Sequence, residues 1–290
     1  MKKANTIVLL ALVIMLFGCT NNNSYKTTVV QSADGIDVAS EKGSEYAYLY
    51  DREVKENMPN KIFNFEGEEY PASYIETRYH QNRSYRFDLY RDEEYREFYV
   101  REDTGELVSA YVLVGGFLDA EYNKDTVENI EEVMREYGKK YASMYLKNPE
   151  NYKIIIEEPH ISGENTDKKL KTYALHYQRE ISGYKTSDEV IICVTQSGRI
   201  YGFSVFDADL YDNNLTIDKA KIEESIKASL NDLAKSSDWN IVENEIYSQQ
   251  IILRPDGKYA LMTRVKVSLK NKSNEIINTG VEFSTIIGKK

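Results

Sequence analysis

The chain has 290 residues, with 47 acidic against 37 basic side chains and a formal net charge of −10 at pH 7. A chain this acidic does not bind nucleic acid through bulk electrostatics, and no basic cluster stands out along it. Its length is sufficient for two or three separate hydrophobic cores.

The first 19 residues have the three parts of an export signal. Two lysines precede an uninterrupted apolar run of eleven residues, 7–17. That run suits a signal-peptide core but is well short of the roughly 20 residues that a membrane-spanning helix needs. Leu16, Gly18 and Cys19 then resemble the lipobox of bacterial lipoprotein signal peptides. The resemblance implies that a signal peptidase recognises Leu16 and Gly18, that the chain is cleaved before Cys19, and that a diacylglyceryl group is attached to the Cys19 thiol.

An ordinary secreted protein and a single anchor helix are the alternatives to a lipoprotein. The chain turns polar directly after Cys19, and no later stretch approaches the length of a membrane span. Two or more acyl chains hold a protein stably on a bilayer without such a span. Thr20 stands where Asp commonly retains lipoproteins at the inner membrane of Gram-negative cells, and the richness in Lys, Asn, Ile and Tyr is typical of a low-GC Gram-positive organism. We therefore expect the protein at the outer face of the cytoplasmic membrane.

Composition divides the chain into five expected segments. A signal peptide over residues 1–18 is followed by a lipidated, flexible tether over 19–44, which is rich in Asn, Ser, Thr, Gly and Asp. Three folded modules are expected after it, over residues 45–119, 120–212 and 213–290.

Two segments, residues 124–147 and 216–235, carry apolar residues at helical spacing. Asn123 or Asp125 is available as the N-cap of the first, and Thr216 as that of the second. The expected apolar stripes are Ile130, Met134, Tyr137, Tyr141 and Met144 in the first helix, and Ile222, Ile226, Leu230 and Leu233 in the second.

Alternating or apolar runs rich in β-forming residues predict strands elsewhere. Polar turns around Gly198 and Gly257 predict two hairpins. The expected strands lie at residues 85–91, 173–179, 189–195, 200–206, 246–253, 258–269 and 276–287. Once Cys19 is lipidated, Cys193 has no disulfide partner within the chain, and its apolar surroundings predict a buried, unreactive thiol.

Two of the hairpins follow the same plan. Residues 95–112 and 189–205 each read as a strand, a polar turn with one glycine, and a second strand. The two glycines, Gly105 and Gly198, are 93 residues apart, which is the size of one small module. The hypothesis is an internal repeat. Its alternative is the general similarity of hairpins in antiparallel proteins.

The order of strand, Arg, Gly-Tyr, strand, glycine turn and strand resembles the PepSY and YcdB/YcdC-like group of bacterial extracytoplasmic domains. The residues that carry this resemblance are Tyr173–Arg179, Gly183-Tyr184, Asp188–Val190 and Ser197–Ile200, and it covers residues 120–206. The resemblance implies an α+β fold of tandem cystatin-like modules, each a helix packed on an antiparallel sheet. Some members of the group are proposed to inhibit or regulate peptidases, which is an analogy at the level of the fold.

No catalytic motif is present in the sequence. The chain has three histidines, His80, His160 and His176, and lacks both a Gly-x-Ser-x-Gly elbow and a His-Glu-x-x-His helix. No glycine-rich phosphate loop appears either. We therefore expect no catalytic residues, no metal and no cofactor, with convergence of the three histidines on a metal as the open alternative.

Two further features have both a functional and a structural interpretation. Asp207, Asp209 and Asp212 offer oxygen ligands at short spacing, as Ca²⁺ prefers, although the segment 207–214 fails the EF-hand pattern. The alternative is a solvated connection between a strand and a helix. The 24 tyrosines suit either an aromatic binding face or ordinary strand composition.

These observations favour a non-enzymatic lipoprotein, attached to the membrane through the lipid on Cys19, that binds a protein or peptide partner in the cell envelope. The alternative is a lipoprotein that binds a small ligand or a cell-wall glycan. The two differ in the surface they require, since a peptide binder needs an exposed groove or an open sheet edge.

Overall fold

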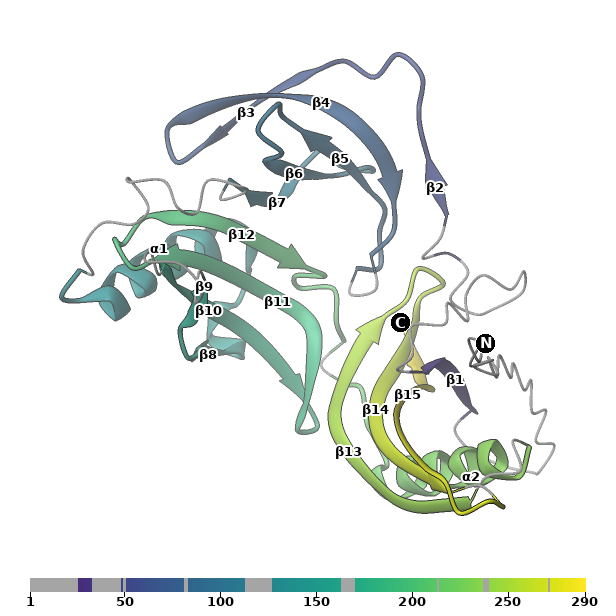
Figure 1. Ribbon diagram of the computed structural model, residues 1–290. Coiled ribbons are helices and arrows are strands. Elements are labelled where there is room, and N and C mark those ends of the chain that lie inside the picture. The colour runs from purple at the N-terminus through teal and green to yellow at the C-terminus, as the bar shows by residue number, and fades with distance from the viewer. Residues whose placement is uncertain are drawn as a thin grey trace, which may run out of the picture. The chain divides into compact units, whose positions relative to one another are not determined.

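The computed structural model describes residues 26–32, 48, 51–80, 83–112, 127–162, 170–212, 214–236, 240–270 and 272–290. Over these residues the chain is mostly β-strand, with two α-helices (Figure 1). It divides into two compact units. The larger unit comprises Tyr48–Leu215 and Ile252–Gly257, and the smaller comprises Thr216–Ile251, Lys258–Lys289 and the described N-terminal residues 26–32.

The larger unit is built on one continuous antiparallel sheet. Its strands follow the order β2-β4-β5-β6-β7-β12-β11, with β10 also paired to β11, β3 to β4, and β8 and β9 to β10. The strands are β2 (Arg52–Glu53), β3 (Lys61–Phe65), β4 (Glu68–Arg78), β5 (Phe87–Arg91), β6 (Glu97–Arg101), β7 (Leu107–Tyr111), β8 (Tyr152–Ile156), β9 (His160–Ser162), β10 (Leu170–Ile181), β11 (Tyr184–Thr195) and β12 (Ile200–Phe206).

Strands β7 and β12 join the two halves of this sheet. They pair antiparallel, with Phe203 opposite Ala110 and Ser204 opposite Ser109. The two serine hydroxyls lie 2.5 Å apart, and the Ser109 hydroxyl also donates to the Phe203 carbonyl oxygen at 3.0 Å. Because both serines are buried, these bonds satisfy polar groups that would otherwise lie unpaired in the sheet.

Helix α1 (Ile130–Tyr145) covers one face of the larger sheet and is followed by a short 3₁₀ turn, Pro149–Asn151. It packs on β10 and β11, and Met134 and Tyr141 are its buried apolar anchors. Gly138 allows this close approach, because a Cβ atom there would lie 3.0 Å from side-chain atoms of both Leu175 and Tyr177. Helix and sheet thus share one hydrophobic core.

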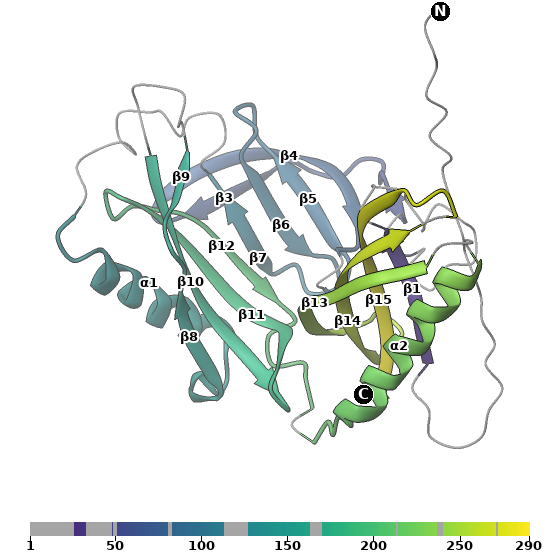
Figure 2. The same cartoon turned by 60° about the horizontal axis from the view of Figure 1, so that its bottom comes forward.

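The smaller unit is a second helix-and-sheet layer. Its strands follow the order β1-β15-β14-β13, and α2 packs on β1 and β15 (Figure 2). Among residues 219–232 of α2, whose burial is described, Ile222, Ile226 and Leu230 are buried. The elements are β1 (Lys26–Ser32), α2 (Lys219–Ser236), β13 (Asn240–Leu253), β14 (Lys258–Lys270) and β15 (Ile276–Lys289).

The expected fold class, tandem cystatin-like modules with one helix packed on each sheet, is wrong. Where the structure describes the chain, it is mostly a large sheet with two α-helices. The described part of residues 48–112 contains strands and no α-helix, so it has no helix of its own to cover a separate sheet. Its last strand, β7, pairs with β12 instead, and the two expected modules share one core.

Most individual elements agree with the sequence predictions. Both helices and the two predicted hairpins are present, and Gly198 and Gly257 have φ angles of 76°, in the left-handed region that favours glycine. The second helix is capped by Asp218 rather than Thr216, since the Lys221 amide donates to its carboxylate at 3.2 Å. Strand β1 lies within the segment expected to be a tether and pairs with β15. Among the described residues, neither helix combines the length and apolarity of a membrane span.

Phe203 provides a test of the shared core. Its ring contacts Phe65, Tyr141 and Tyr145, with centroid separations of 5.9, 4.7 and 5.7 Å. Phe203 of β12 therefore packs against both strand β3 and helix α1. We expect Phe203→Ala to lower the free energy of unfolding by about 3–5 kcal/mol, measured by urea denaturation. The control Ile62→Ala removes a side chain that is 69% exposed and should cost less than about 1 kcal/mol. Equal losses would contradict a single core centred on Phe203.

Candidate functional site

The three histidines lie on different elements of the larger unit. His160 is exposed in β9, His80 follows β4, and His176 lies in β10. Burial, together with Arg83 and Arg78, lowers the pKa of His80 to about 4. No group of three or more His, Cys, Asp or Glu side chains among the described residues is placed to hold a metal. The histidines therefore form no site there.

His176 of β10 takes part in an ion-pair cluster with Glu189 of β11 and with Glu157, which directly follows β8. Its Nδ1 lies 2.6 Å from a Glu189 carboxylate oxygen, and its Nε2 lies 3.4 Å from Glu157. Burial alone would lower the pKa of His176, but the two carboxylates outweigh it, so the pKa is raised. Cys193 is also on β11, and burial raises the pKa of its thiol to about 11. It is buried and unbridged, as predicted, and its thiolate form is suppressed.

The acidic segment that follows β12 folds into a tight turn that points inward. Asp207 and Asp209 have φ angles of 45° and 57°. Asp207 is fully buried and accepts hydrogen bonds from the Ser84 amide and hydroxyl, both at 2.8 Å, and from the Ser187 hydroxyl at 3.1 Å. The Asp209 carboxylate accepts a hydrogen bond from the Lys147 amide. The expectation of a solvated connection is therefore wrong for Asp207, which is buried and bonded to the protein's own amide and hydroxyl groups.

A buried ion pair lies next to this turn. Arg179 Nη1 donates to Asp188 Oδ2 at 2.7 Å, and the Tyr152 hydroxyl donates to Asp188 Oδ1 at 2.5 Å. Arg179 also donates to the Tyr211 carbonyl oxygen at 3.2 Å. The Asp209 amide adds a third donor to the Asp188 carboxylate, at 3.2 Å. Together these bonds hold the turn against β8, β10 and β11.

Burial raises the pKa values of two aspartates in this cluster, Asp188 and Asp207. It raises the pKa of Asp188 to about 6 against the opposing effect of Tyr152 and Arg179, and it raises the pKa of Asp207 to about 7. Raised carboxyl pKa values are typical of acid/base catalysts but also of structural networks. Both side chains are 0% exposed, so no substrate reaches them in this conformation. The cluster therefore serves the fold.

The raised pKa of Asp207 makes stability depend on pH. Between about pH 4 and pH 7 the folded carboxyl group keeps a proton that the unfolded group has released, so this group's contribution to stability falls as pH rises. Asp207→Asn keeps an acceptor for Ser84 and cannot ionise. We expect the variant to gain stability relative to the parent between pH 4 and pH 7.5, by on the order of 3 kcal/mol, measured by urea unfolding.

The control for this experiment is Asp212→Asn, which changes an exposed carboxyl of the same segment. A parallel pH profile for Asp207→Asn and the parent would show that Asp207 is ionised throughout this range.

Most described tyrosines are structural rather than surface-forming. Tyr70, Tyr90, Tyr141 and other rings are buried in the larger core. Tyr95 and Tyr247 are the tyrosines among the exposed large side chains of the described residues, at 65% and 50%. A broad aromatic binding face is therefore not seen in this part of the chain, and strand composition accounts for the abundance of tyrosine.

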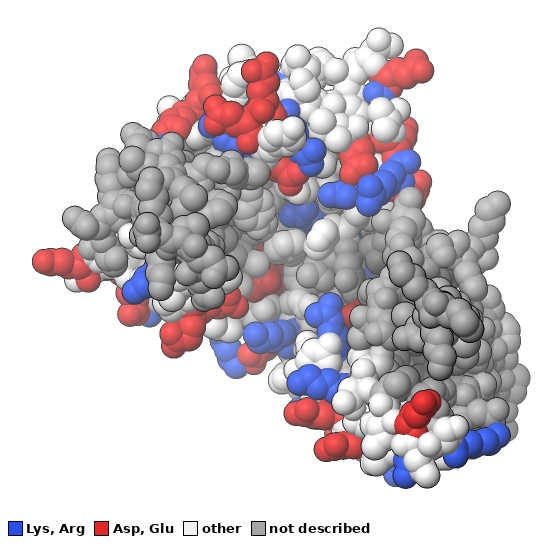
Figure 3. Space-filling model, viewed as in Figure 1, with Lys and Arg blue, Asp and Glu red and all other residues white. Residues whose placement is uncertain are grey.

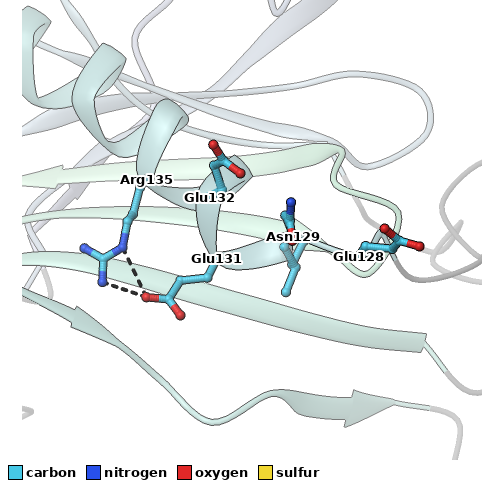
Figure 4. A pocket seen from close by; sticks show the side chains of 6 residues that line it. Glu128, Asn129, Glu131, Glu132 and Arg135 are labelled. Carbon is cyan, nitrogen blue, oxygen red and sulfur yellow. Dashed lines mark hydrogen bonds and ion pairs between the residues drawn. The ribbon is translucent and has the colours of Figure 1, made fainter.

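The described surface includes two shallow hollows. One lies at the start of α1 and is lined by Glu128, Asn129, Ile130, Glu131, Glu132 and Arg135 (Figure 4). Glu131 there accepts from Arg135 at 2.7 Å, and its side chain is 64% exposed. A pair this exposed contributes at most about 1 kcal/mol. The hollow contains solvated charge and no buried polar group.

The second hollow is a shallow groove across β13, β14 and β15, with a volume of about 550 Å³. We call it the β13 groove. Lys266 lies opposite Gly280 and Ser268 opposite Asn278 in the β14–β15 pairing, so the missing side chain of Gly280 leaves the surface hollow beside Lys266. The groove is lined by Glu243, Glu245, Tyr247, Lys266, Val267, Ser268, Asn278, Thr279 and Gly280.

The β13 groove combines carboxylates, a cation and an aromatic ring within one small area. The Lys266 ammonium lies 5.4 Å from the centroid of the half-exposed Tyr247 ring. The Ser268 hydroxyl donates to the Asn278 side-chain oxygen at 2.7 Å. Such a mixture can accept cationic and apolar groups together. It is the candidate functional site of the described residues.

The sequence prediction missed the residues of this groove. It began the strand at residue 246, whereas β13 begins at Asn240. Glu243, Glu245 and Tyr247 lie at alternate positions, as strand residues on one face do. The predicted strand did not include residues 240–245, because the two glutamates and two asparagines there are unfavourable in strands. The predicted lipidation residues Leu16, Gly18 and Cys19 lie outside the described residues.

Comparison of the chain with protein-family models, with curated proteins and with solved structures found no match. The resemblance to PepSY and YcdB/YcdC-like domains therefore remains an interpretation of the sequence.

Proposed function

We propose that the chain is a non-enzymatic lipoprotein, anchored through Cys19 at the outer face of a bacterial cytoplasmic membrane, which binds a protein or peptide partner in the β13 groove. The anchoring part of the proposal rests on the apolar run and the motif that ends at Cys19. The binding part rests on one observation, the exposed groove beside β13 with its carboxylates, cation and aromatic ring.

The absence of an evident catalytic arrangement in the described residues is consistent with a binding role. The acidic groups with strongly raised pKa values are sealed from solvent, and the His176 cluster pairs the imidazole with two carboxylates. On the face seen in Figure 3, acidic and basic side chains are interspersed over the described residues rather than gathered by sign. Recognition would then depend on local pairing in a groove rather than on a long-range field.

Lipidation can be tested with a matched pair of cysteine variants. Cells that express the chain would be fed an alkyne-tagged fatty acid, and the protein would be examined by gel fluorescence after coupling to a dye. We expect label on the parent and on Cys193→Ala, and none on Cys19→Ala, because the acyl groups are attached through residue 19. Label that persists in Cys19→Ala would contradict the anchoring proposal.

Partner binding can be tested by replacing Tyr247 with a photoreactive phenylalanine analogue in living cells. Tyr95, which is 65% exposed in the other unit, provides the control position. We expect one envelope protein, identified by mass spectrometry, to crosslink at position 247 and not at position 95. The addition of Glu243→Gln and Glu245→Gln should weaken that crosslink, since both line the groove.

Two results would overturn the peptide-binding proposal. Crosslinks of equal yield at positions 247 and 95 would show that the groove is not the site. A cell-wall fragment or a small molecule as the adduct at 247 would establish the alternative of a glycan or small-ligand lipoprotein instead.

A further inference from the structure

Strand β8 is an edge strand of the larger unit. It pairs antiparallel with β10, and the same residues of β10 pair with β11 on their other side (Figure 2). In the described part of the sheet, β8 pairs with no strand other than β10. The outer edge of such a strand presents backbone N–H and C=O groups that another extended chain can pair with.

The pairing with β10 fixes which backbone groups of β8 point outward. The Glu157 amide donates to the Ala174 carbonyl oxygen at 3.0 Å, so Glu157 directs its backbone groups toward β10. This direction alternates from residue to residue along an antiparallel strand. Ile155 therefore directs its backbone groups inward as well, whereas those of Ile154 and Ile156 point outward.

The side chains of this edge are apolar in the middle and charged at both ends. Ile154, the first of three consecutive isoleucines, is 45% exposed. Lys153 and Glu157 flank the isoleucines, and their side chains are 64% and 59% exposed. Being four residues apart, they share one face of the strand but lie about 13 Å from each other. A lysine at an edge opposes strand addition unless the added strand offers a carboxylate opposite it.

We propose that two copies of the chain associate through β8, in a two-fold symmetric antiparallel strand pair centred on Ile155. Ile154 of each copy then lies opposite Ile156 of the other, and because both have outward backbone groups, each such pair exchanges two N–H···O=C bonds. Lys153 of each copy lies opposite Glu157 of the other on one face, which gives two ion pairs across the interface. The edge is thus complementary to itself, and this complementarity identifies the partner as a second copy.

The neighbouring registers fit less well. A shift of one residue would place the outward backbone groups of Ile154 opposite the inward groups of Ile155, so the bonds could not form. A shift of two residues restores the backbone bonds but places Ile155 opposite either Lys153 or Glu157, and both ion pairs are lost. The backbone pattern and the charges therefore select the same register.

This inference is independent of the proposed function. Strand β8 belongs to the larger unit, whereas the residues of the β13 groove belong to the smaller one. Failure of either proposal leaves the other standing.

The register predicts which positions a disulfide can join. Membranes from cells that express the full-length chain with one added cysteine would be treated with a mild oxidant and analysed on non-reducing gels. We expect Ile155→Cys to give a covalent dimer, because residue 155 faces its own counterpart at a separation that a disulfide spans. Ile62→Cys, at a position of β3 that is 69% exposed, should give none. The parent chain controls for Cys19 and Cys193.

A second cysteine pair tests the register itself. Two differently tagged copies, one with Lys153→Cys and one with Glu157→Cys, would be expressed together. We expect a disulfide between the two tags, because these positions lie opposite each other in the proposed pair. Neither variant should crosslink to itself, since its own counterpart lies about 13 Å away along the partner strand.

Charge reversal tests the ion pairs. Lys153→Glu or Glu157→Lys alone places like charges opposite each other, and we expect the yield of the Ile155→Cys crosslink to fall about tenfold. The double variant restores opposite charges across the interface and should recover the yield. Within one chain Lys153 contacts Glu180 and Glu157 contacts His176, and both contacts stay altered in the double variant. Recovery therefore reports pairing between copies.

Each other outcome contradicts the inference. Equal dimer yields from Ile155→Cys and Ile62→Cys would show random collision, and no dimer from Ile155→Cys would show that the edge stays unpaired. A disulfide from residue 155 to a different protein would identify a heterologous strand as the occupant. Folded charge variants, checked by thermal unfolding, whose double form does not recover would contradict the register. If a charge variant does not fold, the cysteine pair at 153 and 157 decides alone.

Discussion

The pairing of β7 with β12 is the contact on which the larger unit depends. It joins two runs of antiparallel strands, β4 to β7 and β12 back to β10, and it brings Phe203 into a core shared with α1. In this register Phe203 lies opposite Ala110, and these residues are 93 positions apart, as are Gly105 and Gly198. Because the strands run antiparallel, Phe203 and Ala110 are the one pair of the printed register with this spacing, and the flanking pairs are 91 and 95 positions apart.

This junction explains why similar hairpins did not produce separate modules. A hairpin with one open edge leaves backbone groups unpaired, and a second hairpin of the same plan is a suitable partner for that edge. Once β7 and β12 pair, the apolar face of the first run continues into the face covered by α1. One helix then serves two hairpins, because the core is already continuous.

Burial of charge is the second constraint on the larger unit. Asp188 and Asp207 come from β11 and from the turn after β12, and each is held by donors from several parts of the chain. A buried carboxylate is tolerated where such donors surround it. The network is a poor candidate for a functional site, because the exclusion of solvent that raises these pKa values also excludes ligands. The β13 groove has the opposite character, with charged groups that remain in contact with water.

The sequence by itself determined the local elements, because hydrophobic period, turn residues and helix ends are properties of neighbouring residues. Both helices, the glycine turns and the buried Cys193 strand were predictable for that reason.

Only the tertiary structure decided which strand edges pair, which carboxylates are buried and where the surface is hollow. The choice of β12 as the partner of β7 depends on residues about 90 positions apart, and period-2 patterns are alike in every strand. Glu243 and Asp207 are both acidic residues in polar stretches of sequence, yet one lines a groove and the other is sealed in the protein. Sequence pattern alone cannot separate them, because burial is set by what packs against a segment and not by the segment itself.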